Sequence, residues 1–171
     1  AVNAAPDGAT VVLGVGNYEG PVTIDRSLTI RGVGCALTTI DGRNEASVLR
    51  VSGDATLSLA DLRVAHGSGE PISATASGNF GGGILTEGGL LSERVCIDHN
   101  RADLGAALFA GPYAEVVLEE TTIRENFDGY GAVYLDYGGS TRIVDTEIES
   151  NATDQPATGW PAFGGAINSG T

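Results

Sequence analysis

The sequence predicts an all-β solenoid, a fold in which similar coils of the chain stack on one another. A short pattern, an isoleucine followed three positions later by an asparagine, ends at Asn100, Asn126 and Asn151, so its copies lie 26 and 25 residues apart. Soon after each asparagine comes a glycine followed by small and apolar residues, at 105–108, 131–134 and 164–167, with a further copy at 81–84. A unit of this length cannot bury its apolar face alone, so we expect the repeats to stack.

Apolar and polar residues alternate between these signals, as at 56–59 and 62–64, which indicates strands with one face turned inward. Alignment on the asparagines gives four columns that we expect to line the core: Leu57, Leu90, Val116 and Thr141; Leu59, Ser92, Leu118 and Ile143; Leu62, Val95, Thr121 and Thr146; Val64, Ile97, Ile123 and Ile148. Segments 10–13, 22–24, 28–30 and 38–40 supply one or two further coils. Three short strands per coil, all running the same way round, predict a right-handed parallel β-helix of about six coils of 23–26 residues.

The composition fits one elongated, turn-rich domain. The 171 residues include 26 glycines and no methionine, and no apolar run approaches the roughly 18 residues that a direct membrane span needs. We expect a single domain over 1–171, with N-terminal coils in 1–42, regular coils in 43–171, and long loops at 68–81 and 152–164. Both ends of the sequence are abrupt, so we expect the natural protein to be longer.

The net charge restricts the classes of molecule that the protein is expected to bind. The net charge of −13 opposes binding to nucleic acid or anionic lipid and favours cations or neutral partners.

The repeat alignment places Cys35 and Cys96 about two rungs apart, and at roughly 4.8 Å per rung that separation exceeds the usual reach of a disulfide. The sequence therefore predicts two free thiols.

Two stretches resemble known β-helical proteins. Residues 6–42 look like the first coils of the pectate-lyase-like superfamily. The pairing of Gly-Gly-Ala-Ile with Ile-x-x-Asn is similar to the G-G-A-I and F-x-x-N repeats of chlamydial polymorphic outer-membrane proteins and related bacterial surface β-helices, with isoleucine where phenylalanine is usual. The resemblance implies a β-helix on the outside of a bacterial cell. It leaves the activity open, because the superfamily includes lyases, hydrolases, esterases, adhesins and spacers.

Asn100, Asn126 and Asn151 fall at one corner of successive coils, where we expect their side-chain amides to form a structural ladder and their backbones to take a left-handed turn. Beside them, Asp98, Arg124 and Glu149 form a column of alternating charge that we interpret as ion pairs fixing the register. A lyase is the alternative. In that case Arg124 would be the base, Asp98 or Glu149 would hold a calcium ion, and Asp128 would be a further catalytic candidate.

Two carboxylate pairs have the spacing that glycosidases use, Glu93 with Glu119 and Glu87 with Asp136, but no motif supports either. His66 and His99 share one column, and they suit a turn better than a metal site because no further ligand joins them at a suitable spacing. We therefore expect no metal and no cofactor, with Ca²⁺ only under the lyase interpretation.

Loop lengths give the most specific functional signal. The two long loops leave the same edge three coils apart, and could form the walls of a shallow groove. Its predicted binding residues are Arg101, Asp103, Phe127, Asp128, Tyr130 and Trp160, a mixture of aromatic and charged groups that suits sugar rings. The alternative is that the loops are tolerated insertions whose aromatic residues cover their own undersides.

The sequence thus favours an extracellular or cell-surface module with a structural or adhesive role, which binds a glycan or another surface protein. A polysaccharide lyase or hydrolase of the pectate-lyase-like kind is the main alternative. A third hypothesis is a subunit of a larger extracellular assembly that self-associates through its coil ends.

Overall fold

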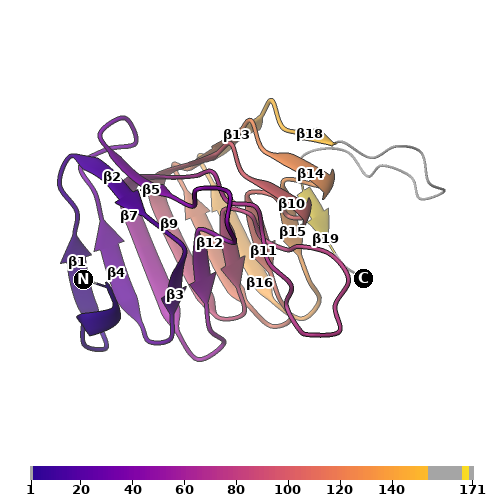
Figure 1. Ribbon diagram of the computed structural model, residues 1–171, viewed down its shortest axis with the longest axis horizontal. Helices are drawn as coiled ribbons and strands as arrows, with labels where there is room; N and C mark the ends of the chain where they lie inside the picture. The colour runs from indigo at the N-terminus through magenta and orange to yellow at the C-terminus, as the bar shows by residue number, and fades with distance from the viewer. Residues whose placement is uncertain (1, 154–166, 170–171) are drawn as a thin grey trace.

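The computed structural model describes residues 2–153 and 167–169, and this part of the chain is almost entirely β-structure (Figure 1). A three-residue 3-10 helix, Val2–Ala4, precedes the strands. The strands are β1 (Ala9–Val12), β2 (Gly16–Glu19), β3 (Val22–Ile24), β4 (Leu28–Arg31), β5 (Thr38–Asp41), β6 (Leu49–Val51), β7 (Thr56–Ala65), β8 (Ile84–Thr86), β9 (Gly89–Asp98), β10 (Arg101–Leu104), β11 (Leu108–Ala110), β12 (Glu115–Glu119), β13 (Thr122–Arg124), β14 (Phe127–Tyr130), β15 (Val133–Leu135), β16 (Ser140–Val144), β17 (Glu147–Glu149), β18 (Ala152–Thr153) and β19 (Ile167–Ser169). In the described residues, no helix has the length and apolarity needed to cross a lipid bilayer.

The strands build parallel sheets. The largest contains the row β1-β4-β7-β9-β12-β16, extended alongside by β2, β5, β13 and β17. The others run β3-β6-β8-β11-β15-β19 and β10-β14-β18. Figure 1 shows the first row side by side in chain order from the N-terminal to the C-terminal end. Because each strand pairs with the strand one sequence repeat away, the arrangement is compatible with a parallel β-helix.

The register agrees with the predicted columns. Leu90 pairs with Leu57 on one side and Val116 on the other, and Ile97 lies between Val64 and Ile123. Ile148 follows Ile123 in the same column. Alignment on the asparagines therefore identified neighbours in the sheet correctly, because a parallel ladder keeps the same residue order on every strand.

A single left-handed residue bends the chain in each of four consecutive repeats of the large sheet. Asp61 and Arg94 have φ of 56° and 52° in the middle of the ten-residue strands β7 and β9. At the equivalent points Glu120 separates β12 from β13 and Asp145 separates β16 from β17, each with φ of 47°. Residues other than glycine rarely adopt this conformation, so its recurrence at one register position marks a built corner.

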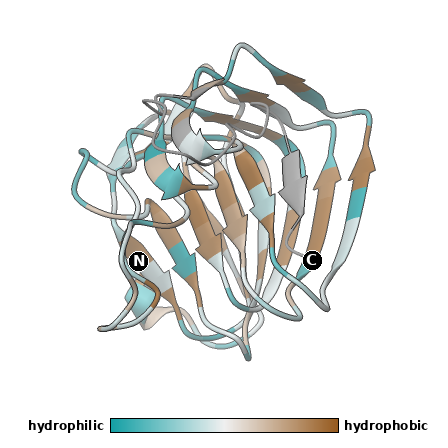
Figure 2. Ribbon diagram, turned by 90° about the vertical axis from the view of Figure 1, so that its right-hand side faces the viewer, coloured by the Kyte–Doolittle hydropathy of each residue, from teal (hydrophilic) through white to brown (hydrophobic). Residues whose placement is uncertain are grey.

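The inward faces form one apolar core, which includes Leu57, Leu90 and Leu108. Figure 2 shows the strands carrying much of the hydrophobic colour. Two hydroxyl groups interrupt the core, but they satisfy each other, since the oxygens of Ser92 and Thr121 lie 2.8 Å apart. Ile143, in the terminal strand of the row, is 37% exposed where its column ends.

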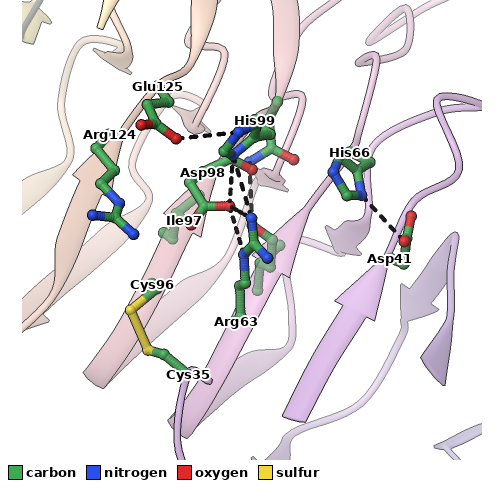
Figure 3. A network of polar contacts seen from close by, with 12 residues as sticks. Cys35, Asp41, Arg63, His66, Cys96, Ile97, Asp98, His99, Arg124 and Glu125 are labelled. Atoms are coloured by element: carbon green, nitrogen blue, oxygen red, sulfur yellow. Dashed lines mark hydrogen bonds and ion pairs between the residues drawn. A yellow bond between two sulfur atoms is a disulfide. The ribbon is translucent and has the colours of Figure 1, made fainter. Parts of the chain in front are cut away.

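The prediction of free thiols was wrong, because Cys35 and Cys96 form a disulfide with a Cα–Cα distance of 5.8 Å (Figure 3). Cys35 lies in the loop between β4 and β5, outside the ladder on which the rung count was based. The loop lies against β7: Gly34 N donates to the carbonyl of Asp61 at 2.7 Å, and Cys35 Sγ lies 3.3 Å from the carbonyl oxygen of Leu62. The loop thereby carries Cys35 across one strand to β9.

Candidate functional site

The three predicted ladder asparagines stack as a continuous hydrogen-bonded column. Asn100 Nδ2 donates to Asn126 Oδ1 at 3.0 Å, and Asn126 Nδ2 donates to Asn151 Oδ1 at 3.0 Å. Asn100 also serves the backbone, because its Oδ1 accepts the N–H of Gly67 and its Nδ2 reaches the carbonyl of Val64. Since Asn100 and Asn126 are buried, these bonds satisfy main-chain groups that water cannot reach.

The left-handed conformation expected of the asparagines occurs one residue earlier. His99, Glu125 and Ser150 have φ of 55°, 53° and 54°. The bend therefore lies at the residue before each asparagine, and the asparagine side chain bonds to its equivalent in the next repeat.

A polar network lies beside this ladder (Figure 3). Its centre is Asp98, a buried carboxylate whose Oδ1 lies 2.7 Å from Arg63 Nε and 2.6 Å from Arg63 Nη2. The sequence prediction paired Asp98 with Arg124, and in register Arg124 does lie opposite Asp98 and Glu149. The ion pair that satisfies Asp98 comes instead from Arg63, on the preceding repeat.

Two histidines extend the network across neighbouring strands. His99 Nδ1 lies 3.2 Å from Asp98 Oδ1, and His99 Nε2 lies 3.1 Å from Glu125 Oε2. His66 Nδ1 lies 3.1 Å from Asp41 Oδ2, and the two imidazole rings meet edge to face at 5.9 Å. Arg63 Nη2 also lies 3.3 Å from His99 Nδ1. The corner residues therefore link four consecutive repeats.

The pKa of Asp41 is lowered. Burial acts in the opposite direction, but it is outweighed by the hydrogen bond from the backbone N–H of Arg43 and by those from Asn17 and His66. Asp41 is therefore held as a carboxylate that anchors the first repeats at this corner.

Of the three catalytic candidates, Asp98 and Arg124 lie in register in the large sheet, while the backbone of Asp128 belongs to another sheet. Asp128 lies on β14 opposite Ala102, in a different sheet from Asp98 and Arg124. Asp98 is buried against a guanidinium group, where a calcium ion would add a second positive charge next to Arg63. Nowhere in the described part of the chain do three His, Cys, Asp or Glu side chains gather to hold a metal ion.

The predicted groove floor consists of strands where the sequence suggested loops. Arg101 and Phe127 pair in register on β10 and β14, and the Arg101 guanidinium lies 5.9 Å from the centre of the Phe127 ring. Phe127 is 45% exposed, and Tyr130 pairs with Leu104 in register. Trp160 lies outside the described residues, so the second wall of the predicted groove has no structural description.

Asp103 fixes the long loop in addition to its predicted place among the binding residues. Its Oδ2 accepts the backbone N–H of Asn79 at 2.8 Å, which fixes the long loop at 68–81 to β10. An ion pair between Arg50 and Glu70 at 2.8 Å holds the beginning of the same loop. Asp103 therefore helps to position the loop, and because its side chain is also exposed, its role in binding stays a prediction.

The long loop also covers an aromatic cluster on the outer face of β8 and β11. Phe80, Leu85 and Phe109 are buried together, and Ile72 from the loop packs against them. The rings of Phe109 and Tyr134 stack at 5.4 Å. Burial raises the pKa of Tyr134, and the nearby carboxylate of Asp136 adds to this. These contacts fit the alternative interpretation of the loop, in which aromatic residues cover its underside.

A shallow groove of ≈ 330 Å³ lies on the outer face of the large sheet, where it crosses β1, β4, β7, β9 and β12. We call it the sheet groove. It is lined by Thr10, Thr29, Arg31, Ser58, Leu59, Ala60, Leu91, Ser92, Glu93, Val117 and Glu119. Thr10, Thr29, Ser58, Leu91 and Val117 form one outward column in register, with small hydroxyl residues at the N-terminal end. This outward column is the sequence signal that could have located the groove.

Alternating charges border one side of the sheet groove. Asp61 lies 3.5 Å from Arg31 and 2.7 Å from Arg94, and Arg94 also pairs with Glu93. The hydrogen bond from Arg94 lowers the pKa of Asp61 and raises that of Arg94 itself. Asp61 and Arg94 therefore both remain charged around neutral pH. The ion pairs between the arginines and the carboxylates hold these side chains in place along the border of the groove.

Glu93 and Glu119 both line the sheet groove and are direct register partners on β9 and β12. This is the nearer of the two predicted carboxylate pairs.

Comparison of the chain with protein-family models, with curated proteins and with solved structures gives no match.

Proposed function

We propose that this chain is a right-handed parallel β-helix that works outside the cytoplasm as a structural or adhesive module and binds a glycan on its lateral face. The observation that carries this proposal is the sheet groove, a solvent-facing hollow that crosses five strands and combines hydroxyl, carboxylate, guanidinium and aliphatic groups.

Support for the β-helix comes from the parallel sheets and the asparagine ladder. Each main sheet is a row of strands taken from successive repeats, and the asparagines connect the same corner of three repeats. A right-handed sense follows the general preference of parallel crossover connections. This architecture presents a large, regular surface from a short repeating sequence.

Support for a location outside the cytoplasm comes from the Cys35–Cys96 disulfide. Disulfides persist in secreted and surface proteins, while the reducing cytosol of most organisms keeps thiols free. The net charge of −13 favours solubility and opposes attachment to anionic lipid or nucleic acid.

The chemistry of the sheet groove suits a carbohydrate. Ser58 and Thr29 offer hydroxyl groups that both donate and accept, and Glu93 and Arg31 offer charged partners for sugar hydroxyls. Leu91, which is 45% exposed, offers an apolar surface for the C–H face of a sugar ring.

An oligosaccharide array tests this proposal. The wild-type protein is expected to retain a glycan, and Ser58→Phe, which fills the middle of the groove, is expected to abolish retention. Thr75→Phe in the exposed part of the long loop is the matched control and should bind like the wild type. A wild-type protein that retains no glycan, or a Ser58→Phe variant that binds as well as the wild type, contradicts the proposal.

A glycoside hydrolase is a second candidate, favoured by Glu93 and Glu119. Neighbouring strands lie about 4.8 Å apart, close to the roughly 5 Å that separates the carboxylates of retaining glycosidases. The test is product formation from whichever oligosaccharide the protein binds. A hydrolase should release product and lose that activity in Glu93→Gln and in Glu119→Gln, whereas intact substrate after incubation with the wild type excludes this candidate.

Assembly through the ends of the stack is a third candidate. A cavity of ≈ 460 Å³ at the N-terminal end is lined by Val2, Leu13, Val22, Ile30 and Ile40, among others. A second copy stacking there would cover the cavity and bury the accessible parts of Val2 and Val22. Sedimentation at increasing concentration should then show self-association that Val22→Lys weakens, and a monomer at all concentrations would exclude it.

A further inference from the structure

Two tyrosines at adjacent turns are unusually exposed. Tyr113 is 71% and Tyr137 is 56% exposed, although both belong to ordered turns that lead into β12 and β16. Their rings meet edge to face, with centroids 5.8 Å apart. Two exposed rings in contact offer an apolar surface on which a ligand can stack, with a phenolic hydroxyl at the edge of each ring.

The main chain holds the Tyr113 ring in place. Gly138 has φ of 78°, and a Cβ atom built at Gly138 would come within 2.6 Å of Tyr113 Cε1. Only glycine therefore allows the ring to lie on the turn before β16. The Tyr113 N–H also donates to the carbonyl of Tyr137 at 3.2 Å, which ties the two turns together. The backbone bond therefore keeps the two turns that carry the rings next to each other.

A polar hollow lies next to Tyr113. It has a volume of ≈ 220 Å³ and is lined by Gly53, Asp54, Ala55, Thr56, Glu87, Gly88, Gly89, Tyr113 and Glu115. Gly88 and Gly89 allow neighbouring chain segments to pack closely here, because a Cβ atom would collide with the Ala55 carbonyl oxygen at Gly88 and come within 2.6 Å of Thr56 Oγ1 at Gly89. Three carboxylates surround it, from Asp54, Glu87 and Glu115. One of them, Glu87, is oriented by Arg50 Nη2 at 3.5 Å.

The hollow is a continuation of the sheet groove. Thr56 and Glu115 precede Ser58 and Val117 by two residues on β7 and β12, so their outward side chains lie about 7 Å further along the same strands. A second hollow of ≈ 290 Å³ lies beyond Tyr137 and includes Asp136. Each ring of the aromatic pair therefore adjoins a hollow, and the hollow beside Tyr113 is the one that contains three carboxylates.

We propose that Tyr113 forms a sugar-binding subsite, in which a neutral pyranose ring stacks on the tyrosine and donates hydroxyl hydrogens to Glu87, Glu115 and Asp54. This inference rests on the proposed glycan-binding function and specifies its ligand class. Carboxylates accept hydrogen bonds from sugar hydroxyls, whereas three of them together repel the carboxylate of a uronic acid. The ligand is therefore a neutral oligosaccharide long enough to reach from the sheet groove to Tyr113.

The experiment measures the affinity of neutral and uronic-acid oligosaccharides for the wild type and for variants by titration calorimetry, after thermal unfolding has shown that each variant folds. Tyr113→Ala should weaken binding of the neutral oligosaccharide at least about tenfold, because a stacked aromatic ring is lost. Tyr113→Phe should bind like the wild type, since the ring remains. In the wild type, the Tyr113 ring resonances should shift on addition of the neutral oligosaccharide.

The outcomes separate this inference from the function on which it rests. If the wild type binds no oligosaccharide, both are overturned. If the wild type binds and Ser58→Phe abolishes binding while Tyr113→Ala does not change it, the sheet groove is retained and the subsite is rejected. Tighter binding of uronic-acid than of neutral oligosaccharides also overturns the assignment of the ligand class.

Discussion

Cys35 and Cys96 are joined by a disulfide although β7 lies between the strands that carry or flank them. The bond closes a loop with a sequence separation of 61 residues and fastens the first repeats to β9. In the chain-entropy description, a loop of this length stabilises the folded state by about 4 kcal/mol at 25 °C.

Removing this bond should lower the free energy of unfolding. We expect Cys35→Ser to cost roughly 2–5 kcal/mol, because the unfolded chain regains the freedom that the bond removes. Urea unfolding of the oxidised wild type and of the variant measures the difference. The double variant Cys35→Ser/Cys96→Ser is the control, and it should be insensitive to a reductant that destabilises the wild type. Equal stability of the wild type with and without reductant would contradict the prediction.

The asparagine ladder should be a large local contributor to stability. Asn100→Ala removes the acceptor for the N–H of Gly67 and the donors to the carbonyls of Val64 and Asp98, all within the buried corner. Because unpaired buried groups cost about 1–3 kcal/mol each, we expect a loss of at least about 2 kcal/mol by urea unfolding. Asn79→Ala, at an exposed position, should change stability by less than about 0.5 kcal/mol. Similar losses in the two variants would show that the ladder contributes little.

Asp98 depends on Arg63 for its charge partner. Arg63→Met should destabilise the fold by about 3–5 kcal/mol, because it leaves a buried carboxylate without the guanidinium. Arg43→Met removes an exposed ion pair with Glu19 at 3.1 Å and should cost less than about 1 kcal/mol. In a double-mutant cycle, adding Asp98→Asn to Arg63→Met should recover part of the loss. Additive effects of the two substitutions would contradict direct pairing.

Stability should fall in acid, and Asp61 should account for part of the loss. The hydrogen bond from Arg94 keeps the pKa of Asp61 below its value in the unfolded chain, which is about 3.9. The contribution is therefore complete above that unfolded value and disappears as the pH falls through the lower folded value. Urea unfolding between pH 6 and pH 2 should show a shallower decline for Asp61→Asn than for the wild type. Asp54→Asn, at an exposed turn, is the matched control, and an unchanged slope in Asp61→Asn would refute the assignment.

The repeating part of the structure could be predicted because one residue pattern specifies one register. Ile97 and Ile123 pair as the alignment requires, and the asparagines that follow them stack. The prediction failed where the chain leaves the ladder. Cys35 lies in a loop whose path depends on contacts with β7, and no periodic pattern records such a path.

The side-chain contacts of the site were harder to predict, because a charged side chain can have several oppositely charged neighbours and the sequence does not show which of them it pairs with. Asp98 has arginines on both adjacent strands and pairs with Arg63, a choice that the columns alone do not determine. Asp103 was expected to line a groove, and the sequence did not indicate that its carboxylate also accepts the backbone N–H of Asn79. The position of the exposed Tyr113 depends on the left-handed Gly138 in the next repeat.

The central claim is that side chains one repeat apart are direct neighbours in parallel sheets. Methyl NOE spectroscopy of selectively labelled protein tests it most directly. We expect contacts between Val64 and Ile97 and between Ile97 and Ile123, because these residues are register partners, and no contact between Val64 and Ile123, two strands apart at about 9.6 Å. Missing Val64–Ile97 and Ile97–Ile123 contacts, together with backbone contacts typical of antiparallel hairpins, would contradict the account.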